Sequence, residues 1–166
     1  MKSCKIQKNT QTALCVLTAI IVAVSFLPLG VNAEDVSYPL DASFISDREF
    51  LSKVIEKTAP EASYVARLAL GALILNRVKD DRFPSSIRAV VYQNGEFECA
   101  SDPDLEETRV SYLSSIAARD ALLGFDVSCG ALYFRRGKAS ERSGSCLYHS
   151  GFIFYKSRDD IPPKYR

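Results

Sequence analysis

The order of helical and strand-like segments predicts an α+β fold organised around one buried helix. Residues 64–78 (YVARLALGALILNRV) are apolar around nearly the whole circumference of a helix, which is typical of a helix buried on all sides. Helical periodicity continues to about residue 123, whereas short aromatic and β-branched runs, typical of strands, follow at 130–134 and 152–155. Helices first and strands last is the pattern of α+β proteins.

The first 33 residues have the parts of a secretory signal peptide. Lysines precede a continuous apolar stretch at 13–27, and Val31-Asn32-Ala33 forms a small-x-small cleavage site. We therefore expect a protein that is secreted or held in the cell envelope, with a mature chain beginning near Glu34. An uncleaved membrane anchor is the alternative, although an apolar run of about 15 residues is short for the roughly 20 that a spanning helix needs.

The rest of the chain is expected to form one domain, because 34–166 is too short for two hydrophobic cores. We assign 34–45 to an N-terminal arm, 46–157 to the domain and 158–166 to a C-terminal tail, which is expected to be extended. Removal of the three signal-peptide lysines changes the formal net charge from +1 to −2. No surplus of basic residues is then left to neutralise a phosphate backbone, which argues against nucleic acid as a partner.

Two capping boxes predict where the first two helices begin. Ser46-x-x-Glu49 precedes apolar residues at helical spacing and predicts a helix over about 47–56. Thr58-x-x-Glu61, with a proline in its first turn, is expected to begin the central helix. Gly71 lies inside that helix, where glycine costs about 1 kcal/mol relative to alanine, so it predicts the close approach of another backbone.

Two more helices and an acidic loop are predicted after the central helix. A short amphipathic helix is expected within 85–93, and a longer one over 110–123 is stopped by Gly124. The polar segment 96–107 between them is expected to be a loop that borders a site, because long loops in small domains often carry function.

Three cysteines follow the signal segment, and at most one pair of them can form a disulfide. Cys129 and Cys146 are the favoured pair because they flank a predicted strand, which leaves Cys99 as a thiol. A third and weaker hypothesis for the protein is a structural envelope component cross-linked through the spare cysteine. The chain has a single histidine and no C-x-x-C spacing, so we expect no zinc site and no cofactor.

Three pieces of the chain form an ordered signature, and the resemblance that they carry covers about 50–155. The first piece is 69–78 followed by 82–87. The second is Val91-Tyr92-Gln93 with Gly95 and Phe97. The third is Ala121-Leu122-x-Gly124 followed by Gly130-Ala131-Leu132-Tyr133-Phe134. In this order and at this spacing they resemble the spore-cortex-lytic, SleB/CwlJ-type cell wall hydrolases. The resemblance implies a lysozyme-like α+β fold, with peptidoglycan glycan strands of the cell wall or of the spore cortex as the partner.

The resemblance also implies glycan cleavage, as muramidase or lytic transglycosylase, of the kind needed for cortex breakdown in germination. Such cleavage needs a carboxylic acid of raised pKa to protonate the glycosidic oxygen. The family's acid lies in a G-E-A-R-G-E segment, and ungapped alignment from Asn76 places Thr58 on the first glutamate and Ala62 on the second. A hydroxyl cannot replace a carboxylic acid as proton donor, so a catalytically inactive wall-binding or regulatory member is the alternative function.

Neighbouring acidic residues are the remaining candidates for catalysis. Glu61 is the preferred acid and Glu56 the second, although a helix cap and a solvated helix end are their ordinary alternatives. Aromatic faces suit the apolar side of a hexose. Candidate substrate-binding residues are Thr58, Glu96, Glu98, Tyr92 and Tyr133. A cationic stretch of Arg135, Arg136, Lys138 and Arg142 would suit an anionic wall polymer, with a solvated hairpin as its default interpretation.

Overall fold

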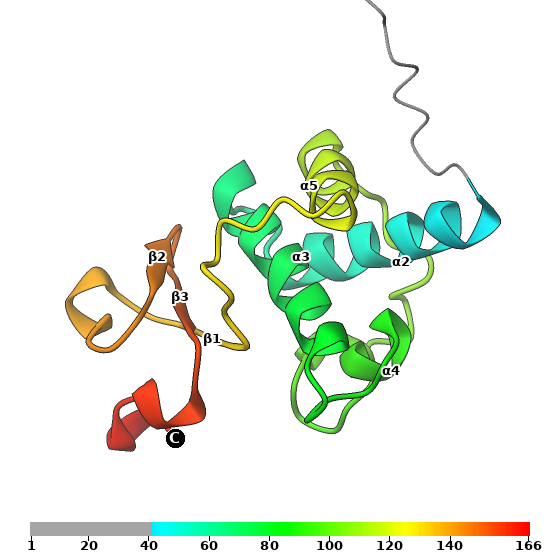
Figure 1. The fold of residues 1–166 in the computed structure, drawn as a ribbon. Helices are drawn as coiled ribbons and strands as arrows, with labels where there is room; N and C mark the ends of the chain where they lie inside the picture. The colour runs from blue at the N-terminus through cyan, green and yellow to red at the C-terminus, as the bar shows by residue number, and fades with distance from the viewer. Residues whose placement is uncertain (1–40) are drawn as a thin grey trace, which may run out of the picture. The chain divides into compact units, whose positions relative to one another are not determined.

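The computed structural model describes residues 41–166. The predicted signal segment and most of the predicted arm lie outside the described residues and stay predictions. Within 41–166, α-helices precede a three-stranded antiparallel sheet, which confirms the predicted α+β class and the small C-terminal sheet (Figure 1). The helices are α2 (Ala42–Thr58), α3 (Tyr64–Lys79), α4 (Ile87–Val91) and α5 (Tyr112–Leu122), and the strands are β1 (Tyr133–Arg136), β2 (Leu147–His149) and β3 (Phe152–Tyr155).

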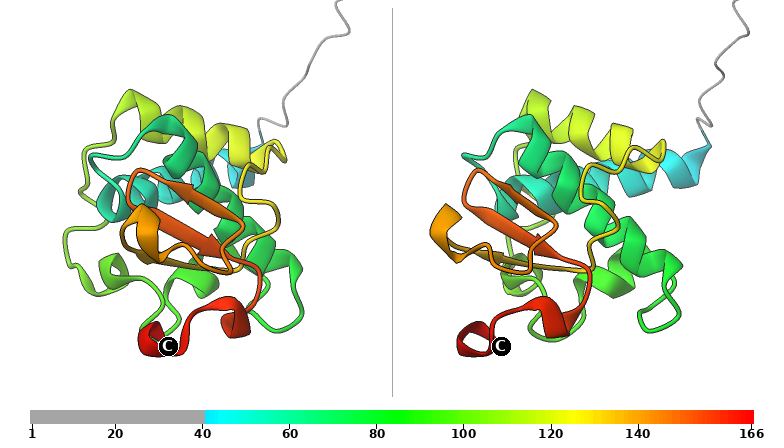
Figure 2. Two further views of the ribbon diagram at one scale, coloured as in Figure 1. Left: turned by 90° about the vertical axis from the view of Figure 1, so that its left-hand side faces the viewer. Right: turned by 60° about the vertical axis from the view of Figure 1, so that its left-hand side comes forward.

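Helix α3 is the centre of the core, as its apolar sequence predicts. It lies between the sheet on one side and helices α2 and α5 on the other (Figure 2). Its buried residues include the consecutive Leu68, Ala69 and Leu70, which point in different directions around the helix. They share one hydrophobic cluster with side chains from the helices and with Phe154 of β3. No helix within 41–166 has both the length and the apolarity to cross a bilayer.

Gly71 marks the contact between α3 and α5. A Cβ atom at this position would lie 3.0 Å from the Cβ of Ala121 and 3.2 Å from Cδ1 of Ile55. The backbone carbonyl of Ala117 is also near, at 3.8 Å. The predicted close approach of another backbone is therefore confirmed.

We expect side chains added at Gly71 to destabilise the protein in order of their size. Gly71→Val forces α5 away from α3 and should cost about 1–3 kcal/mol of unfolding free energy, the usual range for overpacking. Gly71→Ala should cost less, because the better helix propensity of alanine, about 1 kcal/mol, offsets part of the clash. Urea unfolding measures both. A valine variant as stable as the wild type would show that the α3–α5 contact is not tight.

The helix starts differ from both predicted capping boxes. Helix α2 begins after Asp41, whose side chain accepts a hydrogen bond from the Phe44 N–H at 2.7 Å, so the predicted start at Ser46 is wrong. Thr58 is the last residue of α2, not the cap of α3, which begins after Ser63. Pro60 explains the break, because the residue before a proline is disfavoured in the helical region and Ala59 has φ −140° and ψ 55°.

The sheet has the order β1-β3-β2, with all four residues of the middle strand β3 buried. Strand β3 has the predicted bounds, whereas β1 begins three residues later than predicted and pairs Tyr133 with Tyr155. Strand β2 was not predicted, because its three residues are too few to show the alternation of apolar and polar side chains that is typical of a strand. The C-terminal tail forms two 3₁₀ turns, at Arg158–Asp160 and Pro163–Tyr165, and not the extended segment that was predicted.

The predicted disulfide between Cys129 and Cys146 is absent. Both residues are free thiols, as is Cys99. Cys129 is exposed and Cys146 half-buried, and the Cys146 thiol donates to the backbone carbonyls of Ser128 and Phe154 at 3.2 and 3.3 Å. Backbone acceptors thus take the place that the second sulfur was expected to fill.

Candidate functional site

A cavity of about 310 Å³ lies where the C-terminal end of α2 meets the first strand of the sheet. We call it the Thr58 cavity. Its wall is contributed by the end of α2, by the segment after α4 and by β1. Its lining includes Lys57, Thr58, Glu96, Glu98, Cys99, Phe134 and Arg136. The cavity brings together three of the predicted substrate-binding residues, which are Thr58, Glu96 and Glu98.

The part of the cavity around Thr58 presents a hydroxyl, a thiol and a guanidinium group. The Thr58 hydroxyl lies 3.6 Å from the Cys99 sulfur, and Cys99 is buried. Burial raises the pKa of the Cys99 thiol, although the contact with Thr58 opposes the rise. The backbone carbonyl of Thr58 accepts a hydrogen bond from the Arg136 guanidinium. Arg136 has no carboxylate partner among residues 41–166, and its guanidinium lies 5.1 Å from the centre of the Phe152 ring.

Two charged groups of the cavity are already engaged by other side chains. The Lys57 ammonium binds the Asp102 carboxylate at 2.7 Å, which raises the pKa of Lys57 and lowers that of Asp102. Glu96 binds a guanidinium nitrogen of Arg77 at 2.7 Å. Glu98 differs from both, because it is exposed at the start of a 3₁₀ turn and has no ion-pair or hydrogen-bond partner among the described residues.

Glu56, one of the two predicted acids, lies outside the lining of the Thr58 cavity. Its carboxylate accepts hydrogen bonds from Arg67 at 2.8 Å, from the Ser111 N–H at 3.1 Å and from the Ser111 hydroxyl at 2.5 Å. Burial alone would raise its pKa, but the Ser111 and Ser114 hydroxyls and the Arg67 charge outweigh burial and lower it. Glu56 is therefore held as a carboxylate, the form that cannot donate a proton.

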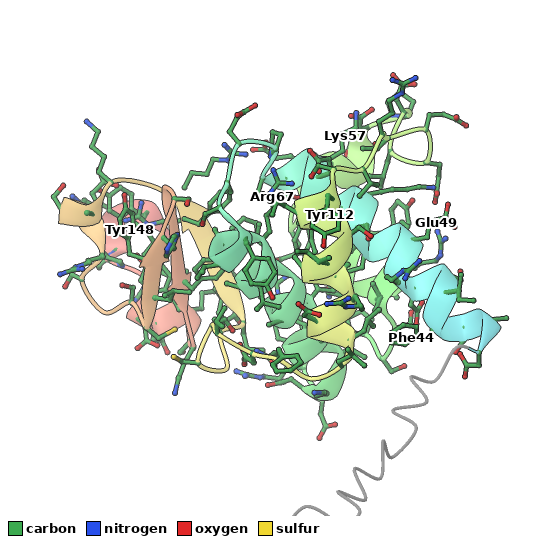
Figure 3. The ribbon with its side chains drawn as sticks, turned by 90° about the horizontal axis from the view of Figure 1, so that it is seen from above. Phe44, Glu49, Lys57, Arg67, Tyr112 and Tyr148 are labelled. Atoms are coloured by element: carbon green, nitrogen blue, oxygen red, sulfur yellow. The ribbon has the colours of Figure 1, made fainter. Side chains whose placement is uncertain are left out.

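Arg67 is the centre of this polar network and joins three helices (Figure 3). From α3 it contacts Glu56 of α2, Ser111 and Ser114 at the start of α5, and the backbone carbonyl of Ala62 at 2.9 Å. The carbonyl of Pro60 accepts a further bond. The network thereby ties the α2–α3 turn, which carries Glu61, to the helical core.

The other predicted site residues are not among the lining residues of the Thr58 cavity. Glu61 is exposed in the α2–α3 turn. Tyr92 is 48% exposed and packs against Phe50, with ring centres 5.9 Å apart. Tyr133 lines a neighbouring cavity. The catalytic role of Glu61 and the sugar-binding roles of the tyrosines stay predictions.

The site residues predicted from the sequence did not include Lys57, Cys99 or Arg136, which also line the cavity. Cys99 was considered only for disulfide pairing or cross-linking. Arg136 was considered only as one residue of a cationic stretch that would suit an anionic wall polymer, with a solvated hairpin as the default. The sequence does contain a signal that could have identified Arg136. Phe134 belongs to the sequence signature, and Arg136 lies two residues further along the strand, so the two side chains share one face of the sheet. No group of three or more His, Cys, Asp or Glu side chains within 41–166 is arranged to hold a metal ion.

A helical core with a small antiparallel sheet at its side and a cavity where the two meet defines the lysozyme-like α+β class. Residues 61–154 match the family model described as Cell Wall Hydrolase, and the chain belongs to this family.

Curated relatives in the family are named spore cortex-lytic enzymes. The one from Halalkalibacterium halodurans is 29% identical over 89 residues, which is 54% of this chain and 27% of that protein. The one from Bacillus cereus is 26% identical over 89 residues, 54% of this chain and 34% of that protein. The match thus spans between a quarter and about a third of the length of these relatives.

Two solved structures share the fold. The catalytic domain of the Bacillus cereus SleB protein superposes with a TM-score of 0.60 at 22% identity, covering 68% of this chain and 91% of that one. The catalytic domain of the germination-specific lytic transglycosylase SleB from Bacillus anthracis gives a TM-score of 0.59 at 23% identity, covering 66% and 93%.

Proposed function

We propose that this protein binds the glycan strands of peptidoglycan in the Thr58 cavity and holds them without cleaving them. One observation carries the proposal. Thr58, at the position where the family resemblance places the proton donor, offers a hydroxyl next to the Cys99 thiol, 3.6 Å away. Membership of the Cell Wall Hydrolase family and the names of the curated relatives support the choice of ligand.

The chemistry of the neighbouring groups supports binding over cleavage. Protonation of a glycosidic oxygen needs an acid whose pKa lies near the working pH. The Thr58 hydroxyl is far too weak an acid, and the pKa of the Cys99 thiol is raised further by burial. Glu56 is held ionised away from the cavity, and Glu96 is the partner of a buried arginine.

The cavity offers what a sugar needs. Its volume of about 310 Å³ is at the lower end of the range of small-ligand sites. The Phe134 ring supplies an apolar face, while Arg136 and Glu98 supply donors and acceptors for hydroxyl groups. The signal segment predicted at the N-terminus would bring the protein to the envelope, where peptidoglycan is found.

Cleavage through Glu98 is the second candidate function. Glu98 lines the same cavity and has no ion-pair or hydrogen-bond partner among the described residues, so its carboxyl group can approach a bound strand. Under this candidate the protein releases soluble muropeptides from sacculi, and Glu98→Gln abolishes the release. Under the binding proposal neither the wild type nor Glu98→Gln releases them.

We expect Arg136→Ala to weaken binding to purified sacculi at least tenfold. The exposed guanidinium forms the wall beside Thr58, and its loss removes a charged donor without opening the core. Cosedimentation at increasing concentrations of sacculi measures the change. Arg109→Ala is the matched control, because Arg109 is exposed and lines neither the Thr58 cavity nor its neighbour. Equal binding by both variants would place the glycan elsewhere on the protein.

A further inference from the structure

A second cavity, of about 270 Å³, adjoins the Thr58 cavity. The two share Gly95, Glu96 and Phe134, so a ligand in one can reach into the other. Its lining includes Arg77 from α3, Tyr133 from β1, and Arg158, Tyr165 and Arg166 from the C-terminal turns. We call it the Arg77 cavity.

Arg77 lines this cavity and carries an unpaired donor. Its side chain is only 2% exposed, its Nε donates to the Leu132 carbonyl at 2.6 Å, and one terminal nitrogen binds Glu96 at 2.7 Å. The other terminal nitrogen is buried without a hydrogen-bond partner among the described residues. A buried donor without a partner costs free energy, more so when it is charged, and a ligand acceptor would recover that loss.

The charges around Arg77 leave a surplus of one cation. Arg158 is exposed and has no carboxylate partner within 41–166, while Arg166 faces Asp159 at 3.7 Å. Of the three guanidinium groups in the lining, those of Arg77 and Arg166 therefore have carboxylate partners, and that of Arg158 has none among the described residues. Burial lowers the pKa of Arg77 and the positive charge of Arg158 lowers it further, while Glu96 opposes both.

We propose that the Arg77 cavity is an anion site that binds a carboxylate carried by the glycan strand, through the free terminal nitrogen of Arg77 and the guanidinium of Arg158. The inference rests on the proposed function, because the strand in the Thr58 cavity brings the carboxylate to its neighbour. Muramic acid carries such a group on its lactyl side chain, or on the peptide attached there.

A carboxylate fits this cavity better than a phosphate does. Planar guanidinium groups match the two oxygens of a carboxylate, although they bind phosphate as well. Charge decides between the two ligands. One negative charge balances the surplus cation, whereas a phosphate dianion would add an excess charge close to Glu96.

The experiment follows the ¹⁵N resonances of the arginine side chains in the purified protein during titration with N-acetylmuramic acid. The acid is expected to shift the Arg77 resonance and to bind at least tenfold more tightly than its methyl ester, which has no carboxylate charge. Arg158→Gln should weaken binding of the acid at least tenfold, whereas Arg109→Gln, which removes an equal charge elsewhere, should leave it unchanged.

Three results would overturn the carboxylate site. They are equal binding of the acid and its ester, unchanged affinity in Arg158→Gln, and tighter binding of inorganic phosphate than of the acid. Cosedimentation with sacculi separates these outcomes from failure of the proposed function. If the wild type binds sacculi but does not bind the carboxylate of N-acetylmuramic acid, the proposed function stands and the anion site is contradicted. If the wild type does not bind sacculi, the proposed function itself is contradicted.

Discussion

Thr58→Glu is expected to give this protein glycan-cleaving activity, which the wild type lacks under the proposed function. The substitution puts a carboxylic acid at the end of α2, in the cavity and beside buried Cys99. A positioned general acid typically contributes a factor of 10² to 10⁴, so release of soluble muropeptides from sacculi should rise at least 100-fold over the wild type. Chromatography of the soluble fraction measures the release.

Thr58→Gln is the matched control, because glutamine has the size of glutamate and no acidic proton. It should bind sacculi as the glutamate variant does and release nothing. A folded Thr58→Glu that cosediments with sacculi and releases no more than Thr58→Gln would contradict the account. The Thr58 cavity would then not be the place where the strand lies in a cleavable position.

The second large effect is expected for Glu56, and it concerns stability. Glu56→Gln leaves the cation of Arg67, whose side chain is 4% exposed, without its carboxylate partner. Removing one partner of a buried ion pair costs about 3–5 kcal/mol. Glu49→Gln is the matched control on the same helix (Figure 3), because Glu49 is 66% exposed and its pair with Lys53 should contribute at most about 0.5 kcal/mol.

The pH dependence of stability follows from the same pair. The pKa of Glu56 is lower in the folded protein than in the unfolded chain, so the unfolded chain takes up its proton first as the pH falls. The stabilisation by Glu56 is complete above the unfolded pKa and is lost as the pH falls through the folded pKa. Unfolding at pH 7 and at pH 3 should therefore show a larger loss for the wild type than for Glu56→Gln. Equal losses would mean that Glu56 is not the carboxylate that holds Arg67.

The fold could be predicted from the sequence where one local signal dominated. The apolar circumference of 64–78 specified a helix buried on all sides, and Gly71 specified the close approach of α5. The helix starts could not be predicted as well, because Asp41 and Ser46 are both good caps and only the completed helix selects between them. Strand β2 is defined by its pairing with β3, a contact that its own three residues do not encode.

The site was predicted only in part, for a related reason. Alignment with the family signature found Thr58, and the acidic loop supplied Glu96 and Glu98. The role of Glu56 depends on Arg67 and on Ser111, which lies 55 positions away along the chain, and such distant partners leave no pattern in one sequence. The Arg77 cavity combines the end of α3 with the C-terminal turns, which no local motif connects.

The most direct test of the central claim is to incubate the purified wild-type protein with purified sacculi and to measure both phases after sedimentation. We predict that the protein is found with the pellet and that the supernatant contains no more muropeptides than sacculi incubated alone. Release of muropeptides by the wild type, abolished in Glu98→Gln, would contradict the account and establish the protein as a glycan-cleaving enzyme.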